Sequence, residues 1–474
     1  MRTQLFTDAQ FEEMAREVVR VLGEVGYHVG HPTVKEWALK AGCRESSAGR
    51  VLLDEAQVQE VRERLRRQYP PRAAEAPEPS LIRPRAELRV GFGNIVPKVY
   101  DHPSRTAQGG NTDNFTAVVR FAQTEPRIVG LTLPVSRQDV PPATEQLESL
   151  VLLAGLTDKP LGPTDAMMPE SVPFLAAMGE ALGHEPGIFV GCCNCINPPL
   201  RLEWRTAETM LQRRRYHSLS MITPMPCLGG SAPVDLWGYT VQAVAEIIGG
   251  LILSIIIDPE APLMGYIAST QTDMRSATMT SSSPQTVRVD AAVVQLMEKC
   301  FGGGTRVGGR TYVSARHPGM QAVFECFLKA VGYSALVDEH ALHYTGCTLA
   351  NGSVLCVEQW LLDYEVMEAL GWLWATPEPA ATPGAAERIA EGVLELGGSF
   401  LGADHTVQHH RTALWDPTFF QRLTDTRTER EILDQCHALY RDRVASYRPA
   451  AQPEDVRREL QRILEEARGK LLGR

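Results

Sequence analysis

Three cysteines stand close together in the run Cys192-Cys193-Asn194-Cys195, the sharpest concentration of reactive side chains in the sequence. Zinc binds thiolates well, and a catalytic zinc site can combine cysteines with a histidine. A zinc centre here would take Cys193, Cys195 and Cys227 as its ligands. Because Cys193 and Cys195 lie only two positions apart, the other ligand would have to come from a neighbouring strand. Small buried thiols that fill space are the simpler interpretation.

The usual signatures of covalent, phosphate-binding and metalloprotease chemistry are missing from the sequence. It holds no Gly-x-Ser-x-Gly nucleophile elbow and no His-Glu-x-x-His motif. The glycines at 302–304 precede a strand-like segment, whereas a phosphate loop opens a helix. The histidines at 405, 409 and 410 are expected at the surface or in a supporting role. These absences point to chemistry that does not need a protein nucleophile.

Short apolar runs alternate with helical patterns along most of the chain, which predicts a parallel sheet covered by helices on both faces. The regular spacing favours a closed TIM-type (β/α)8 barrel over an open sheet. In such a barrel the functional groups follow the carboxyl ends of the strands. The predicted strands are 88–94, Ile128–Leu133, Pro160–Pro163, Gly187–Gly191, His217–Thr223, Pro262–Ile267, Thr305–Val307 and Ala341–Thr345.

Helical segments flank the predicted barrel on both sides. Residues 1–80 are expected to form an N-terminal helical subdomain packed on the barrel, and its first helix begins with Thr7 and Gln10 at capping-box spacing. The barrel is expected to span residues 85–424. Residues 425–474 are expected to be a helical extension, whose last helix is amphipathic and packs on the barrel exterior.

The composition narrows the class of partner. The chain has 474 residues and a formal net charge of −10, with no basic stripe, so a nucleic acid is an unsuitable partner. The most apolar stretch, Ala243–Ile257, is too short for a membrane span and is interpreted as buried. The N-terminus lacks the apolar region of a signal peptide, and the cysteines are sparse. We therefore expect a cytoplasmic protein with reduced thiols, which could form a homo-oligomer.

Several loop segments, in their order and spacing, resemble the trimethylamine methyltransferase family. The similarity runs from about residue 10 to 422. The segments that carry it are Asn194 to Pro198, Gly229 to Val234, Tyr266 to Arg275, Gly308-Gly309, Gly346 to Gly352, Glu358-Gln359 and Gly397 to Gly402 with His405-Thr406. Residues 91–110 and 311–320 depart from the family's pattern.

The resemblance implies a TIM barrel that transfers a methyl group from a methylamine to the Co(I) corrinoid (cobalamin-type cofactor) of a separate corrinoid protein. Family members that act on trimethylamine carry pyrrolysine, whereas every position here is an ordinary amino acid. The chain therefore resembles the non-pyrrolysine branch, for which a quaternary amine such as glycine betaine is the known kind of substrate. The corrinoid would be carried by the partner rather than held permanently by this chain.

The chemistry implied by the resemblance agrees with the missing motifs. Cleavage of a CH₃–N⁺ bond expels a neutral amine, and Co(I) is itself the nucleophile, so no catalytic side chain is needed. The protein must hold the cation, aim one methyl group outward and exclude water. Aromatic faces and a carboxylate suit the cation, and an arginine suits a carboxylate tail.

These requirements select the candidate residues. The substrate-binding candidates are Phe92, Asp165, Asn194, Tyr266, Arg310, Tyr312, His343, Tyr344, Asn351, Glu358 and Phe400. The loop residues expected to face the corrinoid are Gly229, Gly230, Ser231, Gly346 and Gly352. Two alternatives stay open: a zinc-dependent methyltransferase barrel that uses the cysteine cluster on another methyl donor, and a non-catalytic binder of a betaine-like cation.

Overall fold

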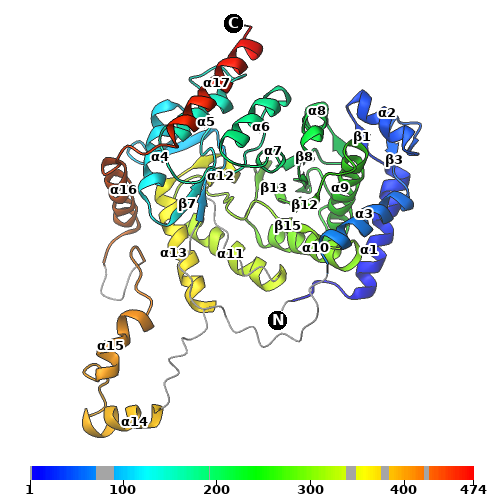
Figure 1. Ribbon diagram of the computed structural model, residues 1–474. Helices are drawn as coiled ribbons and strands as arrows, with labels where there is room; N and C mark the ends of the chain where they lie inside the picture. The colour runs from blue at the N-terminus through cyan, green and yellow to red at the C-terminus, as the bar shows by residue number, and fades with distance from the viewer. Residues whose placement is uncertain are drawn as a thin grey trace.

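The computed structural model describes residues 3–70, 90–191, 193–337, 348–374, 384–420 and 426–473. Within these ranges the chain is a mixed α/β protein (Figure 1). Cys192, His343, Tyr344 and Gly346 lie outside the described residues, as does the predicted strand Ala341–Thr345.

Two parallel ladders follow the order of the chain. The first pairs β4 (Val90–Phe92) with β7 (Ile128–Leu131), and a bridge from Leu131 extends it to Leu161. The second has the order β15-β12-β10-β8, formed by Thr305–Val307, Leu263–Ile267, Ser220–Pro224 and Cys193–Ile196. The described residues contain no closed sheet, so the closed barrel stays a prediction while the parallel arrangement is confirmed.

One predicted strand is wrong. Residues Gly187–Gly191 were expected to be extended, but Pro186–Phe189 form the short helix α7 and the strand begins at Cys193. The run Gly-Ile-Phe-Val-Gly is apolar throughout, and a short apolar run carries no periodicity that separates a helix from a strand. Pro186 at the first helical position favours the helix.

Helices cover the second ladder on one side. Helix α9 (Leu236–Ile257) packs against β10 and β12, and α10 (Pro284–Cys300) packs against α9 and β15. Among the described residues, two helices, α9 and α11 (Met320–Val337), are long and apolar enough to cross a membrane by length and composition. In α9, 89% of the apolar window is buried inside the protein, as expected for the core helix of a globular protein.

The N-terminal helices complete this core. Helices α1 (Asp8–Arg20), α2 (Pro32–Lys40) and α3 (Glu55–Gln68) all contact α9. The predicted capping box is confirmed, because Thr7 accepts from the Gln10 backbone N–H and Gln10 accepts from that of Thr7. Phe11, Met14 and Val18 are buried in the same cluster as Ile247 and Leu251 of α9. The helices at the N-terminus therefore share the core of the second ladder.

A second core lies under the C-terminal helices. It forms around α4 (Thr112–Thr124), α5 (Glu145–Ala154), α6 (Val172–Ala181) and α13 (Val357–Trp374). Helix α16 (Glu429–Ala445) packs on α4 and α13, and α17 (Glu454–Leu471) packs on α5 and α6. Leu460, Ile463 and Leu464 are buried in this core, as the amphipathic pattern predicts. Helices α14 (Ala385–Ala390) and α15 (Asp404–Ala413) extend away from the body in Figure 1.

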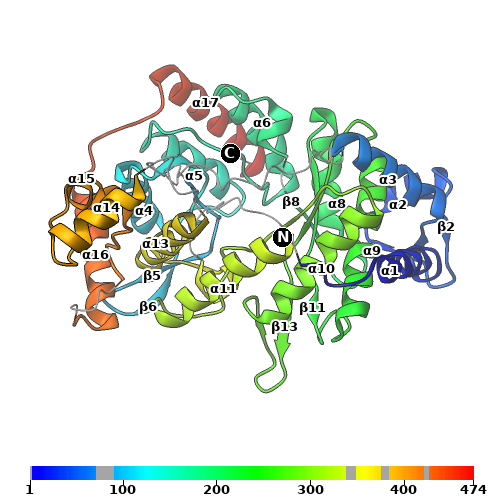
Figure 2. The same ribbon diagram turned by 90° about the horizontal axis from the view of Figure 1, so that it is seen from below.

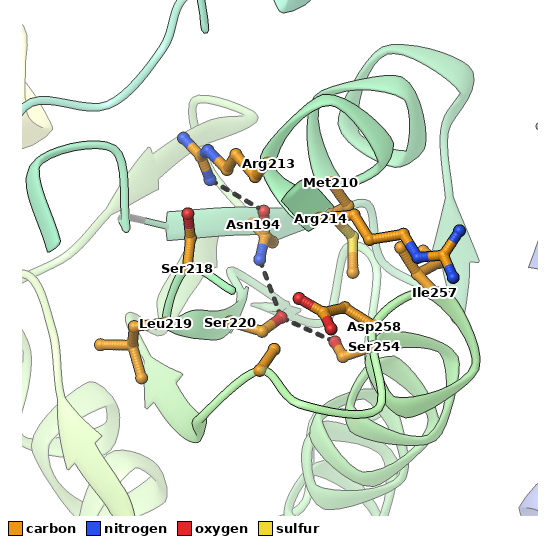
Figure 3. Close-up of a pocket in the computed structure, with 11 residues that line it drawn as sticks. Asn194, Met210, Arg213, Arg214, Ser218, Leu219, Ser220, Ser254, Ile257 and Asp258 are labelled. Atoms are coloured by element: carbon orange, nitrogen blue, oxygen red, sulfur yellow. Dashed lines mark hydrogen bonds between the residues drawn. The ribbon is translucent and has the colours of Figure 1, made fainter. Parts of the chain in front are cut away.

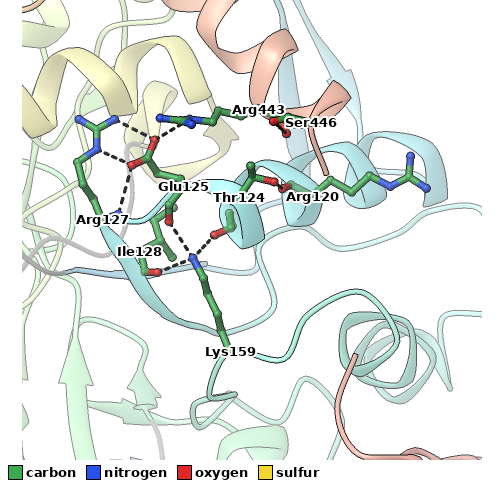
Figure 4. A network of polar contacts seen from close by, with 9 residues as sticks. Arg120, Thr124, Glu125, Arg127, Ile128, Lys159, Arg443 and Ser446 are labelled. Carbon is green, nitrogen blue, oxygen red and sulfur yellow. Dashed lines mark hydrogen bonds and ion pairs between the residues drawn. The ribbon is translucent and has the colours of Figure 1, made fainter. Parts of the chain in front are cut away.

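A buried ionic network joins α16 to the first ladder (Figure 4). Arg127 Nε lies 2.6 Å from Glu125 Oε1, and Arg443 of α16 lies 3.6 Å from the other oxygen. Lys159 Nζ donates to the carbonyls of Ala122, Glu125 and Ile128 at 2.6–2.8 Å. Burial raises the pKa of Glu125, but the hydrogen bonds and charge of Arg127 outweigh it and lower the pKa. The carboxylate is therefore ionised and links the segment before β7 to α16.

Candidate functional site

One face of the second ladder is partly open while the other is fully buried. Burial alternates along β8 and β12, so Cys193, Cys195 and Tyr266 are partly exposed and their neighbours are buried. Because successive side chains of a strand point to opposite faces, these residues share one face of the sheet. The register pairs Cys195 with Thr223 and Tyr266 with Arg306. We call this surface the open face. The opposite face lies under α9 and α10.

Asp165 lies beside the open face. It follows the bridge residue Leu161, and its Oδ1 accepts a hydrogen bond from Cys193 N at 2.8 Å. Gln146 of α5 fixes the loop, because its amide donates to Thr164 Oγ1 at 3.0 Å and accepts from Met167 N at 3.0 Å. The carboxylate therefore has a defined position at the carboxyl end of its strand.

Two tyrosines and an arginine complete the group. Burial raises the pKa of Tyr312, Asn94 donates a hydrogen bond that opposes this, and the charge of Asp165 raises the pKa further. Burial likewise raises the pKa of Tyr266 to about 12, while the nearby Arg310 acts in the opposite direction. Arg310 and Tyr312 act on the pKa of Tyr266, and Asp165 acts on that of Tyr312, so the structure brings the predicted residues Asp165, Tyr266, Arg310 and Tyr312 together.

A buried lysine holds the turn that carries Arg310 and Tyr312. Lys329 of α11 is 2% exposed, and its Nζ donates to the carbonyls of Gly309 and Tyr312 at 2.8 and 2.6 Å. Burial lowers the pKa of Lys329 to about 8. Lys329 is therefore a positioning residue for the turn after β15.

Glycines set the planes of the two tyrosine rings. A Cβ added at Gly308 would collide with the Tyr266 ring, and one at Gly352 would lie 3.1 Å from Tyr312 Cδ1. Gly352 also has φ +86°, a conformation that side chains disfavour. Gly352, expected to face a corrinoid, lies against the Tyr312 ring.

The thiols on the open face are protonated at neutral pH. Burial raises the pKa of Cys193 to about 12, and the charge of Asp165 contributes in the same direction. Burial and Asp165 also raise the pKa of Cys195. Cys193 Sγ lies 3.7 Å from Met221 Sδ, and Cys227 Sγ lies 3.1 Å from Thr272 Oγ1. In the described part of the chain, no group of three metal-ligating side chains includes Cys193, Cys195 or Cys227.

Asn194 does not belong to this group, because it points to the opposite face of β8. Its amide donates to Ser220 Oγ at 3.0 Å and accepts from Arg213 at 3.1 Å, and Ser220 contacts Ser254 of α9 at 2.7 Å (Figure 3). Asn194 is 3% exposed. It lines a small cavity between β8, β10 and the helices α8 (Trp204–Arg213) and α9. The structure therefore places Asn194, a predicted substrate-binding residue, in the hydrogen-bonded layer between sheet and helices and not with Asp165, Tyr266 and Tyr312.

Three further candidates also lie elsewhere. Phe92 is 2% exposed, and its ring packs edge-on against Phe121 and Trp360 in the second core. Phe400 packs locally against Gly392, in the segment between α14 and α15. Glu358 is 2% exposed and bonds His437 at 2.7 Å. Because each of the three packs in another part of the molecule, the structure places them apart from Asp165, Tyr266, Arg310 and Tyr312.

The Asn351 side chain connects two backbone segments. Its Oδ1 accepts from Ser281 N at 3.0 Å and from Ser314 Oγ at 2.9 Å, and its Nδ2 donates to the Met279 carbonyl at 2.8 Å. The residue adopts φ +57°, which asparagine tolerates better than most residues. These contacts connect the turn beside Tyr312 to the 279–281 segment, and we assign Asn351 a positioning role.

The loop Gly229-Gly230-Ser231 lies beside a projecting hairpin. Strand β11 (Cys227–Leu228) pairs with β13 (Thr270–Asp273), which forms a hairpin with β14 (Thr278–Thr280) that projects in Figure 2. Ser231 Oγ accepts from Cys227 N at 3.0 Å and closes the turn. A Cβ at Gly229, φ +71°, would lie 2.5 Å from Met274 Cε. Met274 and Met279 on the hairpin are 68% and 58% exposed.

Sequence reasoning missed Asn94 and Lys329. Asn94 follows β4 just as Asp165 follows its strand, so the rule that polar residues after strands form the site would have found it. Lys329 lies within an apolar helix, where a lone lysine gives no sign of which carbonyls it contacts.

Comparison with known proteins gave a match over nearly the whole chain. The model of the family described as trimethylamine methyltransferase (MTTB) matches residues 1–470. The chain is 23% identical over 394 residues to trimethylamine methyltransferase MttB of Desulfitobacterium hafniense (strain DSM 10664 / DCB-2), covering 80% of this chain and 77% of that protein. It is 24% identical over 344 residues to glycine betaine methyltransferase of Desulfitobacterium hafniense (strain Y51), covering 71% and 70%.

A crystal structure of a hydroxylamine complex of MtmB is also similar. The TM-score is 0.44 at 13% identity, and the match covers 98% of this chain and 93% of that chain.

Proposed function

Because this chain belongs to the trimethylamine methyltransferase family, we propose that it transfers a methyl group from a betaine-like quaternary or tertiary amine to the Co(I) corrinoid of a separate protein. The observation that carries the proposal is the convergence of Asp165, Tyr266 and Tyr312 at one partly open site. Aromatic rings attract a cation through their electron-rich faces, and a carboxylate adds charge.

The residues of the site suit a zwitterion better than a simple cation. Asp165 and the two tyrosines offer a place for a methylated ammonium group. Arg310 lies near Tyr266 and offers a planar guanidinium to a carboxylate tail. Glycine betaine carries both groups, and a glycine betaine methyltransferase is among the similar proteins, beside a trimethylamine methyltransferase of nearly the same identity.

The side chains at the site have no acid–base or nucleophilic task in this proposal. The two thiols are protonated at neutral pH because their pKa values are raised. The protein binds the amine, orients one methyl group toward the open side and limits access of water. A bound Co(I) corrinoid supplies the nucleophile that accepts the methyl group.

The loop Gly229-Gly230-Ser231 and the β13–β14 hairpin fit the approach of a corrinoid-carrying partner. Gly229 and Gly230 bring backbone to the surface, and Met274 and Met279 give the hairpin an exposed apolar surface. Flexible methionines suit a surface that binds a partner transiently. The corrin itself is expected to contact the backbone of this loop, where side chains are small.

The test is a screen of methylated amines, glycine betaine included, against Co(I) cobalamin and read by the absorbance change on methyl-Co(III) formation. Methylation with glycine betaine is expected, and failure with every amine would refute the proposal. D165N keeps an oxygen to accept from Cys193 N but removes the charge, and we expect about a tenfold rise in KM. D139N is the matched control, because Asp139 is exposed and its carboxylate also accepts a backbone N–H, that of Thr112.

A further inference from the structure

Two histidines and two carboxylates meet where α16 contacts the rest of the protein. His102 follows β5 (Lys98–Asp101), Glu358 lies in the first turn of α13, and His437 lies in α16. The ligand atoms of these three residues all lie within 4.8 Å of one another. In the part of the chain that the structure describes, this is the one group of three or more side chains suited to hold a metal ion.

The contacts within the group are those of a pre-arranged donor set. His437 Nδ1 lies 2.7 Å from Glu358 Oε1, and His102 Nε2 lies 2.7 Å from Asp434 Oδ1. The two imidazole rings stack with their centroids 4.6 Å apart. Asp434 and His437 are three residues apart on α16 and therefore lie on the same side of the helix. Each imidazole already faces a carboxylate, and the two pairs lie side by side.

Three of the four side chains are largely shielded from solvent. The side chains of Glu358 and His102 are 2% and 10% exposed, and that of His437 is 20% exposed. The Asp434 side chain, at 53%, is the most exposed of the four. Cys356 Sγ donates to the second oxygen of Glu358 at 3.3 Å, which orients the carboxylate as outer contacts orient metal ligands.

We propose that His102, Glu358 and His437 bind one zinc ion that ties α16 to α13 and to the β5 loop, with Asp434 as the fourth ligand once its exposed side chain turns toward the ion. Two imidazoles and two carboxylates suit a borderline divalent ion, and the two carboxylates neutralise its charge. Zinc–ligand bonds of about 2.1 Å place tetrahedral ligand atoms about 3.4 Å apart. As the ion binds, the two 2.7 Å distances would lengthen and the wider distances between ligand atoms would shorten, and the exposed Asp434 side chain would move most. The site is structural and does not depend on the proposed methyl transfer.

The experiment measures metal binding by the full-length protein directly. After chelator treatment the protein is titrated with ZnCl₂ against a chromogenic chelator, and CoCl₂ serves as a spectroscopic probe of a tetrahedral site. We expect one zinc per chain and visible Co²⁺ absorption bands. H437Q and H102Q should each weaken zinc binding at least a hundredfold. Absence of zinc binding in the wild type would overturn the proposal even if a variant failed to fold.

Two further variants separate this site from other places where zinc could bind. H217Q removes the histidine of a simple His–carboxylate pair, in which His217 Nδ1 lies 3.0 Å from Asp258, and should bind zinc as the wild type does. C195A should also retain zinc, and loss of zinc in C195A would overturn the proposal in favour of the cysteine cluster. Saturating zinc should raise the melting temperature of the wild type by about 3 °C but not that of H437Q. An equal shift in both would also overturn it.

Discussion

A buried glutamate in the middle of α9 makes the stability of the protein depend on pH. Glu246 is fully buried. Its Oε1 accepts from Leu200 N at 3.0 Å and from Gln242 Nε2 at 2.9 Å, whereas its Oε2 contacts no hydrogen-bond donor among the described residues. Burial raises its pKa to about 7, although both hydrogen bonds act against the rise. The substitution E246Q keeps the accepting oxygen and removes the ionisation.

The magnitude follows from the difference between the folded and unfolded pKa. The unfolded chain releases this proton near pH 4.5, and the folded protein releases it near pH 7. One pKa unit corresponds to about 1.4 kcal/mol, so ionisation of Glu246 destabilises the fold by about 3 kcal/mol. Because the folded pKa is the higher one, this contribution to stability is present below pH 4.5, declines as the pH rises and is lost above pH 7. Glutamine stays neutral at every pH.

Differential scanning calorimetry at pH 5 and pH 8 measures the effect. The unfolding entropy scales with chain length to about 1 kcal/mol/K here, so the melting temperature of E246Q relative to wild type should rise by about 2–3 °C between the two pH values. E12Q, at an exposed position of α1, is the control and should show a pH-independent difference. If E246Q shifted the melting temperature equally at both pH values, the assigned burial of an ionisable carboxyl would be refuted.

Three further substitutions test the site. G308A should abolish most methyl transfer, because its Cβ would collide with the Tyr266 ring. The substitution should destabilise the fold by about 1–3 kcal/mol and leave it intact. Wild-type kcat/KM in G308A would contradict the assigned ring position. K329M should raise KM about tenfold or more, because the turn at 309–312 loses both of its lysine contacts, and unchanged substrate kinetics would exclude the positioning role. N351A should speed backbone hydrogen exchange at residues 279–283, since that segment loses its contacts with Asn351. Unchanged exchange would contradict the positioning role of Asn351.

Sequence periodicity predicted a strand correctly when the apolar run also had a clear element before it and a clear end after it. The segment Pro262–Ile267 follows a long apolar helix and ends at small polar residues, and the strand Leu263–Ile267 is confirmed. Gly187–Gly191 offered hydrophobicity alone and forms a helix instead. Closure of the barrel could not be predicted from spacing, because closure depends on the tilt and stagger of strands that are far apart in sequence.

The candidate site was predictable for residues that follow a strand and not for residues within one. Asp165, Arg310 and Tyr312 come after strand ends. A side chain in such a loop lies at the carboxyl edge of the sheet whichever face the preceding strand residue points to. Asn194 lies inside β8, where a shift of one position exchanges the two faces of the sheet. The same period of two places Cys193 and Cys195 on the open face. The aromatic residue type alone could not predict a cation-binding role, because an aromatic ring suits a hydrophobic core equally well. Phe92 packs in the second core.

The ligands of the proposed zinc site lie far apart in the sequence, which is why no motif predicted the site. The same arrangement means that zinc would stabilise the docking of α16. Metal motifs are recognisable when ligands repeat along one helix or hairpin, whereas His102, Glu358 and His437 come from three elements that meet only after α16 docks. Only the i, i+3 pair Asp434 and His437 is local, and such a pair is common on exposed helices. A site assembled by docking stabilises the docked state alone, since the undocked chain offers no complete ligand set. Zinc binding and the attachment of α16 are therefore thermodynamically coupled, so removing the ion should loosen α16 before it affects the open face.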